Sequence, residues 1–327
     1  DVCSSDLCRR EDDEMTHRIR FALFALLAAL GTQAAAQVFN TTRSPKGDKE
    51  WPVVKEGITV KVSPHVYAIP SESVPGVPNV GIIVGSRATL VVDPGMGLKS
   101  GEAVLREVEK ISKNKDLYII NTHFHPEHTT GDLAFPASAK LLRAAAQQED
   151  VDEMGLKWVA VFAARGTHLR DQLQGAKFRE PSEIFDKEKL LDLGGVRVKL
   201  LRLGPAHTRG DTAVFVEGDS VLFSGDLAMH KLFPAFATPQ SRLGSWLTSL
   251  DALDALRAKQ VIGAHYGMSD ASMIGAYRDV LEKQRIEWGI DNVSFVGSKY
   301  GDDLEALFAG CRFMVVPSIW HENFPYV

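Results

Sequence analysis

The stretch Thr122-His123-Phe124-His125-Pro126-Glu127-His128 holds three histidines and a carboxylate within six residues. It comes just after the apolar run 117–120, which is typical of a buried strand. Packing gives no reason to put these groups where a strand ends, whereas a divalent metal ion does, because imidazole and carboxylate are ligands that zinc prefers. Residues two apart in an extended turn point the same way, so His123 and His125 can hold one ion. The other two ligands can then face a second ion.

Three further candidate ligands follow apolar runs later in the chain. His207 comes after the strand-like residues 198–203, Asp226 after residues 221–223, and His265 after residues 261–264. Sheet proteins usually place their sites at the carboxyl ends of strands, so we expect these side chains to meet at one edge. A chance scatter of the ten histidines would rarely place five of them in this way.

Together these residues resemble the signature of the metallo-β-lactamase superfamily, which is His-x-His-x-Asp-His followed by a His, a bridging Asp and a final His. The resemblance covers roughly residues 57 to 284. It implies a first metal site of His123, His125 and His207, a second site of Glu127, His128 and His265, the bridging carboxylate Asp226, and Asp93 as a brace of the metal loop.

The chain departs from this signature at Glu127, where the family has Asp. The extra methylene moves the carboxylate by about one carbon–carbon bond, whereas metal–oxygen distances tolerate only about 0.2 Å. Either the loop adjusts, or the second site is weakened or changed in its metal preference. Glu127 could also be a solvated loop acid, and Asp226 or Asp93 could be an ordinary turn or cap residue. Asp211 is interpreted as a turn former and is not included in the site.

The periodicity of the middle of the chain indicates a mixed α and β domain of about 230 residues, enough for a two-sheet core. Strands are expected at residues 57–69, 80–92, 117–121, 196–203, 212–217 and 220–224, and helices at residues 100–113, 138–158, 246–258 and 273–283. Tight turns are expected at Gly85-Ser86 and Gly218-Asp219. The resemblance implies more, namely an α+β fold, the four-layer αββα sandwich, over residues 57–285.

The expected chemistry is hydrolysis by a metal-bound hydroxide. Residues 57–285 contain no cysteine, so no thiolate can act as ligand or nucleophile. Zinc lowers the pKa of its water to about 7, and Asp226, the expected catalytic residue, would fix the spacing of two ions. The cofactor is expected to be two Zn²⁺ ions, with iron or manganese as alternatives. Asp226 resembles the glyoxalase II, lactonase and phosphodiesterase branches more than the β-lactamases.

The substrate is expected to be a small molecule: an ester, a thioester, a lactone, a phosphodiester or a β-lactam. Residues 155–181, with Trp158, Phe162 and Phe178, are expected to cover the cleft and select it. Two other functions stay open: an iron-containing redox or sulfur-dioxygenase enzyme of the same fold, and a non-catalytic metal-binding module. His230 could contact substrate or lie on the surface. The net charge of −5 and the lack of a basic stripe argue against nucleic-acid binding.

The N-terminal region reads as two segments that precede the folded domain. Residues 1–14 resemble a translated sequencing adapter and are interpreted as an artefact, with a natural polar tail as the alternative. From Met15 a basic start, an apolar core at residues 21–30 and Ala34-Ala35-Ala36 predict a signal peptide over residues 15–36, or else an uncleaved anchor. A linker follows at residues 37–56. We therefore expect a periplasmic or secreted bacterial protein with no stable membrane insertion after cleavage.

The C-terminal residues 286–327 resemble a fragment of a retaining glycosyltransferase with two Rossmann-like domains. The resemblance rests on residues 292–297 and 315–325, where Glu322 would begin a Glu-x7-Glu motif. About 40 residues cannot form that fold or its cleft. The fragment is interpreted as misjoined, with a truncated fusion as the alternative, and genomic DNA across the codons for residues 280–292 would distinguish the two.

Overall fold

The computed structural model describes residues 53–230, 232 and 234–288. The expected artefact at 1–14, the signal peptide at 15–36, most of the linker at 37–56 and nearly all of the fragment at 286–327 lie outside the described residues. The last described helix, α8 (Ser272–Trp288), continues past the expected domain boundary at residue 285.

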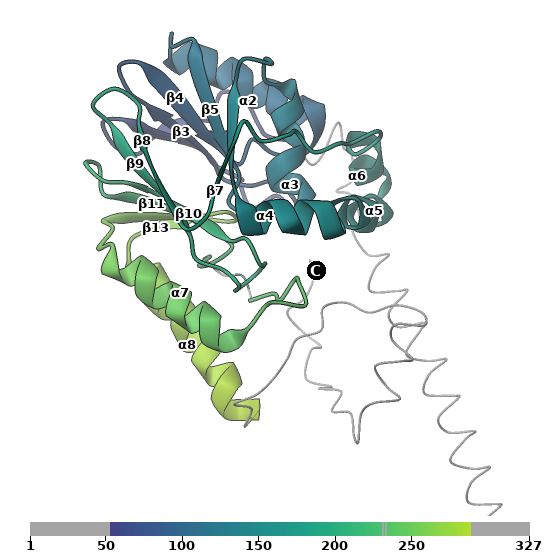
Figure 1. Cartoon of the computed structure of the whole chain (residues 1–327), viewed down its shortest axis with the longest axis vertical. Helices are drawn as coiled ribbons and strands as arrows, with labels where there is room; N and C mark the ends of the chain where they lie inside the picture. Colours follow the sequence, from purple (N-terminus) through teal and green to yellow (C-terminus); the bar gives the residue numbers. More distant parts are fainter. Residues whose placement is uncertain (1–52, 231, 233, 289–327) are drawn as a thin grey trace, which may run out of the picture. The chain divides into compact units, whose positions relative to one another are not determined.

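Two mixed sheets form the centre of the described part (Figure 1). The first has the order β1-β2-β3-β4-β5-β6-β7, with strands Val60–Lys61, Val66–Ile69, Val80–Val84, Ala88–Val92, Asp116–Ile120, Lys140–Ala144 and Glu183–Phe185. The second has the order β13-β12-β11-β10-β9-β8, and β8 to β13 are Glu188–Asp192, Arg197–Arg202, Thr212–Val216, Val221–Gly225, Gln260–Gly263 and Met268–Ser269. Parallel pairing joins β4 to β5, β5 to β6, β6 to β7 and β11 to β12.

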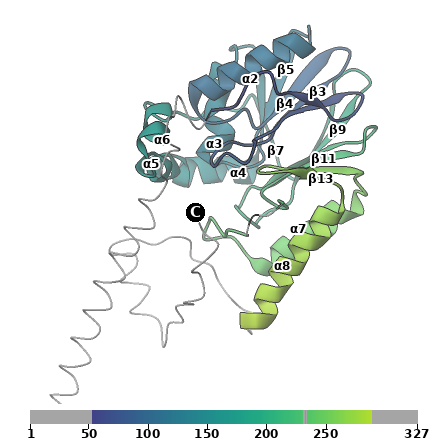
Figure 2. The same ribbon diagram turned by 180° about the vertical axis from the view of Figure 1, so that it is seen from behind.

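Helices cover the outer faces of both sheets. They are α2 (Gly97–Ile111), α3 (Pro126–Thr129), α4 (Ala145–Asp150), α5 (Leu156–Ala164), α6 (Thr167–Gln172), α7 (Leu243–Ala255) and α8, with a 3-10 turn η1 (Thr130–Ala134) and a π turn η2 (Val151–Gly155). Figures 1 and 2 show α2 along the first sheet and α7 with α8 along the second. The four layers follow the order helix, sheet, sheet, helix, so the predicted sandwich is confirmed.

Three apolar layers explain why these elements stack. Between the sheets, alternate residues such as Leu90 and Ile120 meet Leu200 and Phe223 of the other sheet. The opposite face of the first sheet packs under α2, and that of the second packs under α7 and α8 around buried Trp246. Because both faces of each central strand are covered, these strands are almost continuously apolar rather than alternating.

The predicted helix at 138–158 is wrong at its start, where residues 140–144 form strand β6. Its residues favour a helix, but Leu141 and Leu142 are buried on opposite faces between β5 and β7. Burial on both faces outweighs a weak intrinsic preference. The two expected tight turns are confirmed, since β3 pairs antiparallel with β4 and β10 with β11.

Among the residues described, we find no helix with the length and apolar character required to span a bilayer.

Candidate metal centre

The candidate ligands lie at one edge of the sandwich because the strands that precede them run the same way. β4 and β5 are parallel, as are β11 and β12, and β9 shares the direction of β11 because both are antiparallel to β10. Two backbone hydrogen bonds join the sheets at this edge: the Thr212 amide donates to the Thr122 carbonyl at 2.7 Å, and the Asn79 amide to the Ala264 carbonyl at 2.5 Å. The loops after these strands therefore meet.

The structure brings together all seven residues expected to bind metal. They form three overlapping groups, each with its ligand atoms within 4.8 Å of one another: His123, His125 and His207; His123, His128 and Asp226; and Glu127, His128 and His265. All are buried except His265, which is partly exposed. The first and third groups are the two sites that the sequence predicts, and the middle group connects them.

The first group has the spacing of a tetrahedral zinc site. His123 Nε2 lies 3.0 Å from His125 Nδ1, and His207 Nε2 lies 3.4 Å from the same atom. Ligands about 2.0–2.1 Å from a tetrahedral zinc ion are roughly 3.3 Å apart. The three nitrogens can therefore hold one ion without rearrangement of the loops.

Asp226 lies between the two groups. One of its oxygens, Oδ2, is 3.4 Å from His207 Nε2, and the other, Oδ1, is 3.8 Å from His265 Nε2. In the second group the Glu127 carboxylate is 3.8 Å from His128 Nε2. The longer side chain of Glu127 thus still reaches the second group, and Asp226 presents one oxygen to each side.

Five buried atoms of the candidate ligands have no hydrogen-bond partner among the described residues. They are His125 Nε2, His128 Nδ1, Glu127 Oε2, His128 Nε2 and Asp226 Oδ1. Burying such groups without a partner costs on the order of 1–3 kcal/mol each, so buried polar atoms are nearly always paired. A divalent cation would satisfy the last three, Glu127 Oε2, His128 Nε2 and Asp226 Oδ1, and the donor set of imidazoles and carboxylates suits zinc.

The outward nitrogens of three histidines are fixed by the surrounding structure. His207 Nδ1 donates to the Ala235 carbonyl at 2.6 Å, and His265 Nδ1 donates to the Val77 carbonyl at 3.0 Å. His128 Nδ1 lies 3.0 Å from Asp93 Oδ2. Such contacts set the tautomer and orientation of a ligating histidine and leave Nε2 for the metal.

The electrostatics of the histidines differ between the two groups. Burial holds the pKa values of His123 and His125 well below the usual value of histidine, and the neighbouring imidazoles lower them further. Burial also opposes the charge of His128, but the Asp93 carboxylate raises its pKa to about 9. Burial raises the pKa of Glu127. His123 and His125 are therefore neutral and ready to bind, whereas a metal must displace a proton from His128.

Asp93 and Gly225 both contact Thr122 and so position the loop that carries His123 and His125. Asp93 accepts hydrogen bonds from the Thr122 amide and hydroxyl, both at 2.7 Å, and has a left-handed backbone with φ 53°. Left-handed Asp is tolerated but costly, and such strain is common at functional sites. A Cβ at Gly225 would lie 2.6 Å from the Cβ of Thr122, so only glycine fits immediately before Asp226.

Two buried residues that hold the ligand loops were missed from the sequence. Asp211 accepts hydrogen bonds from the Thr208 amide and hydroxyl, next to His207. Asn79 donates to the Gly263 and Tyr266 carbonyls, both at 2.8 Å, on either side of His265. The only signal for Asp211 was its turn-like context. Asn79 carried none, because its partners are more than 180 residues away.

The other histidines in the described range belong to none of the three ligand groups. His65 pairs with Asp219 at 2.8 Å, and His230 and His65 are exposed. The exposure of His230 is compatible with both of its expected placements, on the surface or in contact with substrate. His321 lies outside the described residues.

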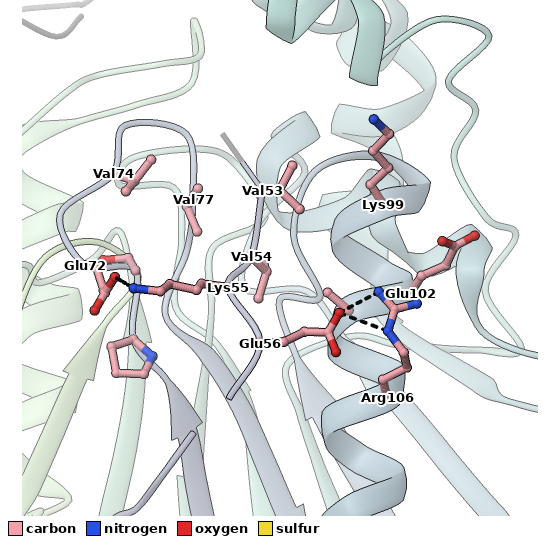
Figure 3. Close-up of a pocket in the computed structure, with 13 residues that line it drawn as sticks. Val53, Val54, Lys55, Glu56, Glu72, Val74, Val77, Lys99, Glu102 and Arg106 are labelled. Carbon is pink, nitrogen blue, oxygen red and sulfur yellow. Dashed lines mark hydrogen bonds and ion pairs between the residues drawn. The ribbon is translucent and has the colours of Figure 1, made fainter. Parts of the chain in front are cut away.

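A cavity of about 550 Å³ lies between residues 53–56, residues 70–77 and α2 (Figure 3). Four of its charged side chains form two pairs: Lys55 Nζ lies 2.8 Å from Glu72, and Arg106 binds Glu56 through two nitrogens at 2.7 and 2.9 Å. None of its lining residues belongs to the three ligand groups. The cavity therefore supplies no chemistry to the metal centre.

Comparison with known proteins agrees with this geometry. Residues 73–265 match a family model described as the metallo-beta-lactamase superfamily. A linear primary-alkylsulfatase from Pseudomonas sp. (strain ATCC 19151) is 23% identical over 214 residues, which are 56% of this chain and 40% of that protein. The human acyl-coenzyme A thioesterase MBLAC2 is 23% identical over 215 residues, 60% of this chain and 75% of that protein. This chain thus spans less than half of the alkylsulfatase.

Solved structures show the same fold at low sequence identity. A metallo-beta-lactamase from Pontibacter korlensis aligns with a TM-score of 0.56 and 18% identity over 69% of this chain and 99% of the other. The sec-alkylsulfatase Pisa1 from Pseudomonas sp. aligns with a TM-score of 0.54 and 17% identity over 71% of this chain and 41% of the other. At this identity the likeness establishes the fold alone.

Proposed function

The chain belongs to the metallo-β-lactamase superfamily, and from this premise we propose that it is a hydrolase that uses two divalent metal ions, preferably zinc. The observation that carries the proposal is the position of Asp226, whose two oxygens are directed at separate groups of ligands. A single structural zinc site needs no such bridge. The bridge therefore favours a two-ion centre over a simple metal-binding module.

His123, His125 and His207 would hold the first ion, and Glu127, His128 and His265 the second. Bound zinc ions supply an activated water near neutral pH and polarise the bond to be cleaved. The protein contributes the fixed spacing through Asp226 and the orientation of the imidazoles through Ala235 and Asp93. Burial of the ligands excludes bulk water, which strengthens these electrostatic interactions.

We propose a carboxylic ester or thioester as the substrate. The name of the human relative describes an acyl-thioester substrate, and that of the Pseudomonas relative describes an alkyl sulfate. Both substrates join a polar reacting group to a carbon chain. The centre contains no side-chain nucleophile other than its ligands, so no covalent acyl-enzyme is expected, and trapping one would contradict the proposal.

The test combines metal quantification with a panel of substrates. The purified protein should hold about two zinc ions per chain and hydrolyse an ester or a thioester faster than a lactone, a phosphodiester or a β-lactam. His125→Ala should lose both metal and turnover, whereas His65→Ala, a control outside the centre, should keep both. Iron as the bound metal would favour the redox alternative, and loss of metal without any change in turnover would favour a non-catalytic module.

Export to the periplasm or beyond is also our proposal, supported by the signal-like residues 15–36. N-terminal sequencing of the mature protein should begin at Gln37. Recovery of an intact segment from Met15 to Ala36 would contradict it.

A further inference from the structure

Helix α5 is unusual because it is apolar but poorly buried. Its sequence, Leu156–Ala164, has one charged residue, yet only Phe162 is fully buried. Trp158 is half-buried, and Leu156 on another side of the helix is 67% exposed. Apolar side chains that stay partly exposed next to a site can line a binding surface.

One face of α5 lies against the first metal group. The Trp158 ring centroid is 4.3 Å from that of His125 with the planes tilted by 41°, and the Phe162 centroid is 6.0 Å from it. Trp158 and Phe162 are four residues apart, so they share this face of the helix. The Trp158 ring therefore forms an apolar surface, here called the wall, that extends from the candidate ligand His125 to the protein surface.

The position of this wall is fixed by contacts on both sides. Phe162 packs on buried Met96, Leu169 and Leu173. Arg209, two residues after His207, lies 3.2 Å from buried Asp150, the last residue of α4. The segment that carries α5 is thus tied to the same loop that supplies His207.

A cation lies on the same face. Arg165 follows Trp158 by seven residues, two helical turns, and its guanidinium carbon is 4.0 Å from the Phe162 ring centroid. A positive group here disfavours a cationic ligand and suits a neutral or anionic one.

We propose that the Trp158 face of α5 binds the aliphatic acyl chain of the substrate, so that the enzyme is selective for esters or thioesters of medium- and long-chain acids. The inference rests on the proposed hydrolase function and names its substrate class. The wall starts at His125, so its occupant must reach the metal centre. An acyl chain joined to the reacting carbonyl does so, whereas a partner protein on this face would cover the centre.

The first test is a chain-length series on the zinc-loaded full chain. In the unchanged protein, kcat/KM should rise at least about ten-fold from p-nitrophenyl butyrate to p-nitrophenyl decanoate. The two acyl chains differ by six methylenes, and full burial of each could multiply kcat/KM by about four, so the expected rise lies well below the limit. Trp158→Ala should reduce this ratio to about two-fold or less. Trp158→Phe should keep most of it. Leu156→Ala, which removes a similar apolar area from another side of α5, should leave it unchanged.

A second test does not depend on turnover. Decanoate should bind at least about ten-fold more tightly than butyrate by calorimetry, and Trp158→Ala should remove the difference. Trp158→Gln serves if the alanine variant does not fold, since glutamine fills more of the space that the tryptophan ring leaves and is still a good helix former. Equal chain-length ratios in the unchanged protein and in the Trp158 variants would overturn the inference. Preferential binding of decanoate without hydrolysis of any ester would overturn the proposed function but not the acyl-chain site.

Discussion

The two halves of the metal centre are built on different physical principles. In the first, burial keeps His123 and His125 neutral, and their nitrogens and that of His207 are 3.0 and 3.4 Å apart. In the second, Glu127 and His128 are 3.8 Å apart, and the Asp93 carboxylate raises the pKa of His128. The first half can bind an ion as it stands. In the second half His128 must lose a proton, and the distance between Glu127 and His128 must shorten.

This difference suggests an order of binding. A preorganised set of ligands loses little free energy on binding, because the loops do not move and His123 and His125 have no proton to displace. The second half depends on the charge of Glu127 and on the bridge from Asp226, so its affinity should be lower and more sensitive to change. The first ion should therefore bind tightly and the second more weakly.

The largest effect should come from Asp226, which contacts both halves. Asp226→Asn keeps the shape of the side chain but removes the charge that bridges the ions. We expect kcat/KM to fall about 1000-fold, equivalent to several kcal/mol of lost stabilisation. Metal analysis should show the first ion retained and the second lost. Two retained ions with full activity would show that the halves do not depend on the bridge.

Glu127→Gln should separate the two halves of the centre. The amide keeps the size of the side chain but gives up a negative charge that a second ion needs. We expect the affinity for the second ion to fall by about 100-fold, with the first unchanged. Competition with a chromophoric chelator would resolve both dissociation constants. An equal loss of affinity for both ions would contradict the distinction between the two halves.

The clustering of the candidate ligands could be predicted from the sequence because its signal is local. His123 and His125 have the spacing of an extended turn, and each later ligand follows an apolar run. The same locality explains the success of the expected hairpins. Strand β6 could not be predicted, since its state depends on β5 and β7, which flank it only in the folded chain.

The residues that hold the ligands escaped prediction for a related reason. Asn79 is a single amide before a strand, and its role appears only when residues 263–266 fold against it. The contact of Trp158 with His125 is likewise set by the path of α4 and η2. The sequence placed Trp158 in a segment expected to select substrate, but it could not reveal which ligand its ring touches.

Asp211 holds the loop of His207 in the first half through its hydrogen bonds with Thr208, and its carboxyl group titrates. Burial raises its pKa to about 6, although His207 and the hydrogen bonds from Thr208 act to lower it, and Asp150 adds to the rise. The folded state therefore holds more protons than the unfolded state between about pH 4 and pH 6, and stability falls as pH rises through this window.

Asp211→Asn removes this titration. The free energy of unfolding of the metal-free proteins can be measured in urea. Between pH 4 and pH 6 that of the unchanged protein should fall by about 2 kcal/mol relative to that of the variant, and above pH 6 the difference between the two proteins should stay constant. A constant difference at every pH would mean that the carboxyl is not perturbed by burial.

Asn79 braces the second half without a charge, so its effect should be smaller and independent of pH. Asn79→Ala removes the donors to the Gly263 and Tyr266 carbonyls and frees the loop of His265. We expect the affinity for the second ion to fall about ten-fold, with the first unchanged.

Asn79→Asp distinguishes the bracing role from simple bulk. The carboxylate can still accept from the Ser71 amide, which now donates to the Asn79 side chain at 2.7 Å, but it cannot donate to the two carbonyls. Its second-ion affinity should match that of the alanine variant. Asn114→Ala is the matched control, because Asn114 also donates to a backbone carbonyl, that of Gly85 at 2.9 Å, but far from the ligands. If Asn114→Ala weakens the second ion as much as Asn79→Ala, the effect is a general loss of stability and the loop of His265 needs no brace.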